Sequence, residues 1–214
     1  MNPNNYLTTI ILLTIWLITG CNNRKASYPT NITRQSKLNI DFISNKFKFH
    51  DLKSFSIDTI GWEERLNIYQ KLDSISFDQV YQDTSQHYLG QHKESVDLDF
   101  YYSTQKNDRG LIECTFLSQR EGEYCDRIFY KIYDLKGKLI SSFRVAGSCS
   151  DGGYYEKAYG QFINDSTYIL LSEDNYKTKD IDHKNIITFS KTFTSIKRNG
   201  TIIHNETSMK NTVD

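Results

Sequence analysis

The chain has 214 residues, which suits one globular domain with short extensions. Hydrophobic residues make up 38% of it and aromatic residues 14%, so there is enough apolar material for a core and a globally disordered chain is excluded. Basic and acidic residues number 26 each, and this balance argues against a nucleic-acid-binding protein.

The first 20 residues carry no charged side chain, and their apolar part, Tyr6–Ile18, spans 13 residues. A bilayer span needs roughly 20 residues, so this stretch is short for a transmembrane helix and suits the hydrophobic region of a secretory signal. The polar residues Asn22, Asn23, Arg24 and Lys25 follow at once, which argues against the alternative of a buried core helix.

The end of this stretch, Leu17, Ile18, Thr19, Gly20 and Cys21, resembles the lipobox of bacterial lipoproteins. The resemblance implies that residues 1–20 are a signal peptide, cleaved before Cys21. It also implies that the Cys21 sulfur carries a diacylglycerol and that its new amine carries a third chain. Two or more acyl chains anchor a protein stably to a membrane.

Residues 21–37 are polar after Cys21 and contain a proline, so we expect a tether there. No acidic cluster of the kind that resembles a surface-export signal follows Cys21, and the abundance of Asn, Lys, Ile and Tyr resembles Bacteroidota proteins. We therefore expect the periplasmic face of the outer membrane as the location.

The body is expected to be a single domain over residues 38–208, beginning with short strands over residues 38–57. The spacing of Trp62, Leu66, Tyr69, Leu72 and Ile75 then predicts one amphipathic helix with these residues on its buried face.

From Val96 onward the hydrophobic period changes to two, with turn residues between the runs. Asn199-Gly200 is the strongest hairpin signal. These patterns predict a mainly β fold: an antiparallel meander of about seven or eight strands with one short N-terminal helix. We expect one solvated face, as in a sandwich or a curled open sheet, and a closed barrel stays an alternative. Residues 209–214 are expected to form a tail.

Three cysteines remain after Cys21. The hairpin centred near residue 136 would place Cys125 and Cys149 at similar heights near its open end. In an exported protein these two cysteines are therefore the candidate disulfide. The alternation of side chains does not establish that both point to the same face, so two free thiols stay the alternative. Cys114 lies between Ile112 and Phe116 and is predicted to be a buried free thiol.

The stretch Asp151, Gly152, Gly153, Tyr154, Tyr155 and Glu156 is a candidate ligand loop, with acids as polar anchors and tyrosines as stacking platforms. A structural turn whose tyrosines cover the core edge is the alternative, and the pattern favours the turn.

No motif for a cofactor or a metal stands out. His87 and His92 are five residues apart, a spacing that does not place both on one helix face. The acids Glu173, Asp174, Asp180 and Asp182 lack the alternation and the central glycine of a calcium loop.

Two functions of different classes remain. The first is a membrane-anchored envelope lipoprotein whose β domain binds a partner protein, peptide or glycan. The alternative is a small exported hydrolase with dispersed carboxylates, for example Asp151 and Glu156 with Glu113. A pocket holding two acids about 5–10 Å apart would favour the enzyme, and an aromatic surface patch would favour binding.

Overall fold

The computed structural model describes residues 37–39, 44–82, 98–120, 124–177 and 185–213, all within one compact unit, residues 35–214. The expected signal peptide, Cys21 and nearly all of the expected tether lie outside the described residues. The elements are the 3-10 helix η1 (Ser44–Lys46), the helices α3 (Trp62–Ile68) and α4 (Ser74–Val80), and the strands β1 (Phe49–His50), β2 (Ser54–Phe55), β3 (Leu98–Gln105), β4 (Ile112–Arg120), β5 (Cys125–Tyr133), β6 (Leu139–Asp151), β7 (Tyr154–Asn164), β8 (Thr167–Lys177), β9 (Asn185–Ile196) and β10 (Ile202–Val213).

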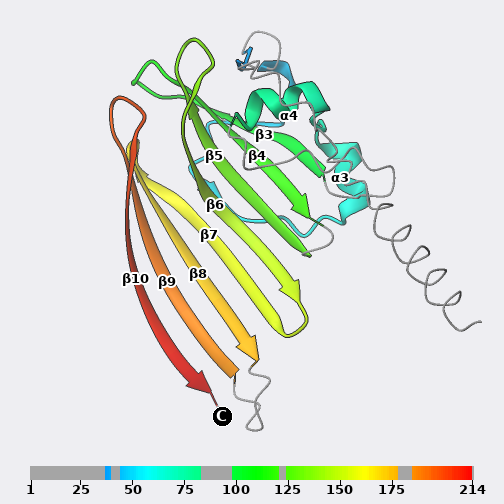
Figure 1. Cartoon of the computed structure of the whole chain (residues 1–214), viewed down its shortest axis with the longest axis vertical. Helices are drawn as coiled ribbons and strands as arrows, with labels where there is room; N and C mark the ends of the chain where they lie inside the picture. The colour runs from blue at the N-terminus through cyan, green and yellow to red at the C-terminus, as the bar shows by residue number, and fades with distance from the viewer. Residues whose placement is uncertain (1–36, 40–43, 83–97, 121–123, 178–184, 214) are drawn as a thin grey trace, which may run out of the picture. The chain divides into compact units, whose positions relative to one another are not determined.

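The strands form one open sheet in the order β1-β3-β4-β5-β6-β7-β8-β9-β10, with β2 pairing β7 off this path (Figure 1). The eight strands β3 to β10 are an antiparallel meander, which confirms the predicted mainly β class. The two-residue strands β1 and β2 raise the count to ten, and β1 pairs with β3 in parallel. Because β1 and β10 are the two edges, the sheet does not close on itself.

The last strand is longer than expected. Its pairing with β9 continues from Ile202 opposite Ile196 to Val213 opposite Asn185, so residues 209–213 belong to β10 and do not form a tail. The Asn199-Gly200 hairpin joins these two strands, as predicted, with Gly200 at a φ of 83°.

The sheet divides where β6 and β7 separate (Figure 1). The two strands pair only from Gly147 opposite Ala158 to Asp151 opposite Tyr154. Farther from the hairpin turn, β6 continues beside β5 and β7 continues beside β8, and β2 pairs with β7 at Gly160 and Gln161.

Two buried clusters form the core. The larger one joins the two parts of the sheet, with Phe100 and Tyr130 from β3 and β5, Phe143 from β6, Tyr168 from β8 and Phe55 from β2. The smaller one covers the other face of β3 to β5 and contains Leu38, Phe47, Leu72, Phe77, Val80, Tyr81, Tyr101, Cys114, Phe116 and Tyr133.

Because both faces of β3 to β5 are covered, the expected solvated face is absent there. Asp99 and Glu113, which alternate with the apolar residues of β3 and β4, are buried as well. Each is compensated by an arginine, with Asp99 Oδ2 at 2.9 Å from Arg120 Nη2 and Glu113 Oε2 at 2.7 Å from Arg109 Nη2.

The helical segment differs from the prediction in number and in orientation. Two seven-residue helices replace the single helix, and the chain between them hydrogen-bonds to β3, with Leu72 N donating to Asp99 O at 2.7 Å. Leu66 and Ile75, predicted to be buried, are 50% and 69% exposed, whereas Arg65 is 1% exposed. No helix among the described residues combines the length and apolar character needed to cross a bilayer.

Candidate functional site

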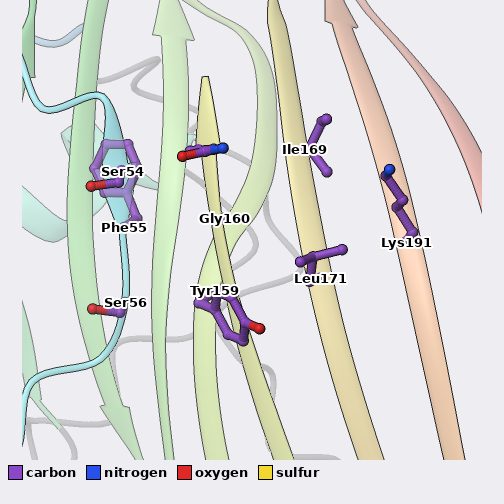
Figure 2. A pocket seen from close by; sticks show the side chains of 9 residues that line it. Ser54, Phe55, Ser56, Tyr159, Gly160, Ile169, Leu171 and Lys191 are labelled. Carbon is purple, nitrogen blue, oxygen red and sulfur yellow. The ribbon is translucent and has the colours of Figure 1, made fainter. Parts of the chain in front are cut away.

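A groove of about 460 Å³ opens beside β2, where β7, β8 and β9 present one face (Figure 2). It is lined by Ser54, Phe55, Ser56, Tyr159, Gly160, Gln161, Ile169, Leu171 and Lys191. A groove of this size accommodates one or a few side chains of a bound molecule.

Strand alternation brings the lining residues together. Tyr159 lies opposite Leu171, and Leu171 lies opposite Lys191 on the next strand. Their neighbours along the strands, Ala158 and Leu170, are buried in the larger core cluster. Tyr159, Leu171 and Lys191 therefore share the outer face of β7 to β9, directed away from the core.

Gly160 is required where β2 meets β7. A Cβ atom at Gly160 would overlap the carbonyl oxygen of Ile169 and would lie 2.7 Å from the Tyr168 hydroxyl oxygen. That hydroxyl donates to the backbone oxygen of Val145 on β6 at 2.6 Å, so it bridges the gap between the two parts of the sheet. The floor of the groove is close-packed because this position has no side chain.

Polar side chains lie at the two sides of the groove, and its middle contains Tyr159, Ile169 and Leu171 together with Gln161. Figure 2 shows Ser54 and Ser56 on one side, Lys191 on the other, and Tyr159 and Leu171 between them. Lys191 Nζ lies 4.8 Å from the centroid of the Phe193 ring, so a cation–π contact orients the ammonium group. The charge of Lys191 remains available to an anionic group because the residue is exposed.

Exposed apolar side chains continue along the outer face beyond the groove. The register places Phe189 opposite Met209 and Ser195 opposite Ile203, on the same face as Leu171. The exposed fractions are Tyr159 47%, Leu171 37%, Phe189 44%, Ile203 45% and Met209 65%; we call these five residues the outer apolar patch. They share this face with polar residues such as Lys191 and Thr207, and a mixture of exposed apolar and polar side chains is typical of an interaction surface.

The predicted ligand loop is a hairpin turn between β6 and β7. Gly152 and Gly153 have φ of 52° and 102°, values that favour glycine in a tight turn. The other four residues are Asp151, Tyr154, Tyr155 and Glu156.

The side chains of this hairpin diverge and do not form a common site. Asp151 and Tyr155 are exposed, and alternation directs Tyr155 to the outer face. Tyr154 Oη donates to Asp174 Oδ1 at 3.0 Å, and burial together with nearby carboxylates raises the pKa of Tyr154 to about 12. Glu156 is buried and forms an ion pair with Arg144.

Glu113, considered for catalysis together with Asp151 and Glu156, lies far from both of them. The register places Glu156 opposite Cys149, Cys149 opposite Cys125, and Cys125 opposite Arg120. Arg120 and Glu113 are seven positions apart on β4, which corresponds to about 23 Å along the strand. Glu113 is also occupied: Arg109 donates to both of its oxygens and Tyr130 Oη donates to one of them.

Cys125 and Cys149 form a disulfide between β5 and β6. Arg127 Nη2 lies 3.4 Å and 3.5 Å from the two sulfur atoms. Cys114 is a buried free thiol, and burial raises its pKa well above the usual range, so the reactive thiolate is suppressed.

The sequence did not indicate a buried polar cluster around Arg65. Its guanidinium lies 2.9 Å from Asp58 Oδ1 and 2.8 Å from Asp126 Oδ1. Tyr69 Oη donates to Asp58 Oδ2 at 2.7 Å and Trp62 Nε1 donates to Asp126 Oδ2 at 3.2 Å. Both carboxylates are already bound by side chains from α3 and its C-terminal end. We therefore infer that the cluster has a structural role and holds that segment against β5.

The described residues contain no group of three or more His, Cys, Asp or Glu side chains that could hold a metal ion. His87, His92, Asp180 and Asp182 lie outside the described residues. Comparisons of the chain with protein-family models, with curated proteins and with solved structures found no match.

Proposed function

We propose that the chain is a lipoprotein of the bacterial envelope, tethered through Cys21 on the periplasmic face of the outer membrane, whose β domain binds a partner protein or peptide. The residues Leu17 to Cys21 support the anchor because they match a lipobox at the end of an uncharged apolar stretch. The groove beside β2 supports the binding role.

The observation that carries the binding role is the position of the groove within an exposed apolar face. The groove offers about 460 Å³ of space, and Tyr159 and Leu171 belong both to its lining and to the outer apolar patch. Burying such residues against a partner is favourable by roughly 25 cal/mol for each Å² of apolar surface.

The chemistry of the groove favours a protein or peptide over a glycan. Tyr159, Ile169 and Leu171 lie in its middle and suit an apolar side chain of the partner. Lys191 at one side suits an acidic group next to that side chain. The alternative of an exported hydrolase has less support, because Glu113 and Glu156 are held in separate ion pairs.

Capture from native envelopes tests the binding role. Leu171→Arg places a charge in the groove, and Ile163→Arg places the same charge on β7 outside the groove lining, where Ile163 is 53% exposed. We expect the lipidated wild-type protein and Ile163→Arg to capture the same partner, and Leu171→Arg to capture at least tenfold less. Equal capture by both variants would exclude the groove as the binding site.

Membrane fractionation tests the anchor independently. The Cys21→Ser substitution removes the sulfur that carries the lipid, so we expect the protein to leave the membrane fraction. Mass spectrometry of the wild-type mature chain should show an acylated N-terminal Cys21. Retention of Cys21→Ser in the membrane would contradict the proposed anchor.

A further inference from the structure

The two edges of the sheet differ greatly in length. β1 has two residues, whereas β10 has 12 residues, contains no proline and pairs with β9 without a break in register. Every residue from Ile203 to Asn211 is exposed, and among the described residues no strand pairs with the far edge of β10. A long regular edge of this kind is a template for another strand.

The hydrogen bonds at the β9–β10 turn determine which groups point to the free edge. Ile196 N donates to Ser166 O, on the β8 side of β9, so Ile196 and the opposite Ile202 are not a hydrogen-bonded pair within this ladder. Successive residues of a strand direct their backbone N–H and C=O groups to opposite edges. The backbone N–H and C=O groups of even-numbered residues from Ile202 to Thr212 therefore point toward the free edge.

We propose that this edge pairs with a second copy of the chain, with β10 antiparallel to β10 of the other copy and a two-fold axis passing beside Ser208. Ser208 is an even-numbered residue, so its N–H can donate to the C=O of Ser208 in the second copy, and its C=O can accept from the N–H of that residue. A two-fold antiparallel pair satisfies the edge groups of both copies at once and leaves no growing end.

Charge complementarity selects this register. Glu206 and Lys210 are both exposed and lie two residues on either side of Ser208, with their side chains on the same face. Pairing about Ser208 places Glu206 opposite Lys210 of the second copy, and Lys210 opposite Glu206, so two opposite-charge pairs form.

Other registers lose this match. Moving the axis to Glu206 places two glutamates opposite each other, and moving it to Lys210 places two lysines opposite each other. Moving the axis by one residue, to Thr207 or Met209, leaves neither Glu206 nor Lys210 opposite the other. Like charges directly opposite each other in a sheet are destabilising, and opposite charges are stabilising.

Cysteine cross-linking tests the position of the axis. Facing residues of a hydrogen-bonded antiparallel pair have Cα atoms about 5.5 Å apart, within the range of a disulfide. We expect Ser208→Cys, in the full chain in its native envelope, to form a covalent dimer under oxidising conditions. His204→Cys is the matched control on the same strand, because the two copies of position 204 would lie about 27 Å apart along the strands.

The wild-type chain gives the background for this assay, since Cys125 and Cys149 are bonded and Cys114 is buried. A covalent dimer with Ser208→Cys, but not with His204→Cys or the wild type, supports the proposed axis. Equal cross-linking at positions 204 and 208, or none at position 208, overturns the proposal. Cross-linking of position 208 to a different protein also overturns it, because the edge then has another occupant.

Charge reversal tests the register without a new cysteine. In the full chain purified in detergent, we expect Glu206→Lys to weaken dimerisation at least tenfold in sedimentation measurements. The double variant Glu206→Lys with Lys210→Glu restores both opposite-charge pairs and should restore the dimer. A monomeric wild type, or a double variant no better than the single one, would refute the pairing. Leu171→Arg lies in the groove and should leave the dimer intact, so this result is independent of the proposed partner binding.

Discussion

Substituting alanine for Gly160 should destabilise the junction between β2, β7 and β8. The added Cβ would overlap the carbonyl oxygen of Ile169 and would lie 2.7 Å and 2.8 Å from two atoms of Tyr168. Both distances are well below ordinary van der Waals contact, so either β7 moves away from β8 or the Tyr168 ring moves. Moving the ring lengthens its hydrogen bond to Val145 O, which is 2.6 Å long.

The magnitude follows from these two effects. Overpacking costs about 1–3 kcal/mol, and loss of the Tyr168 hydrogen bond costs about 1 kcal/mol. Alanine also reduces the conformational freedom of the unfolded chain, which offsets about 0.4–1 kcal/mol of this destabilisation. We therefore expect Gly160→Ala to lower the free energy of unfolding by about 2–3 kcal/mol, which lowers Tm by roughly 5–10 °C for a domain of this size.

Urea unfolding followed by near-ultraviolet circular dichroism measures this change. Gly61→Ala is the matched control, because Gly61 has a φ of −61° and nothing lies within 4 Å of an added Cβ. It should unfold within about 1 kcal/mol of the wild type. If Gly160→Ala and Gly61→Ala unfold at the same urea concentration, the close approach of Tyr168 to position 160 is wrong.

Three further outcomes are expected. Replacing Cys125 and Cys149 by alanine should cost about 3 kcal/mol, given their separation of 24 residues, and a reductant should lower wild-type stability but not that of the double variant. Arg65→Met leaves two carboxylates without their buried cation and should cost about 3–5 kcal/mol in urea unfolding, so a loss below 1 kcal/mol would contradict its role. Burial raises the pKa of Tyr102 to about 12, against about 10 when unfolded. Its contribution to stability is therefore complete below pH 10 and is lost as pH rises to 12. Tyr102→Phe should lose stability less steeply than the wild type over that range, by up to about 1.4 kcal/mol per pH unit.

Local sequence patterns were sufficient to predict the antiparallel meander. The Asn199-Gly200 turn and the period-two runs after Val96 indicated β9 and β10 and the strands before them, because turn chemistry and alternation act between neighbours in the chain. The same reasoning failed at Leu66 and Ile75. Their spacing is helical, but the chain breaks between α3 and α4 to hydrogen-bond with β3, and pairing with a distant strand leaves no local signal.

The groove could not be predicted in the same way. Tyr159, Leu171 and Lys191 belong to three strands, and nothing in their local sequences distinguishes them from other outward-facing strand residues. The paired glycines at 152 and 153 made residues 151–156 a candidate ligand loop, yet they form only the turn of a hairpin. Gly160, which shapes the groove, stands alone within a strand, and only its contacts with Tyr168 reveal its role.

The amino-acid sequence by itself determined the strand-forming segments, the turn between β9 and β10 and the similarity of residues 17–21 to a lipobox, since each depends on residues within one short window. Only the tertiary structure decided that β6 and β7 separate, that β2 enters beside Gly160, and that Asp99, Glu113 and Arg65 are buried with partners of opposite charge. These features arise from contacts between residues far apart in the chain, where packing and charge compensation outweigh local preference.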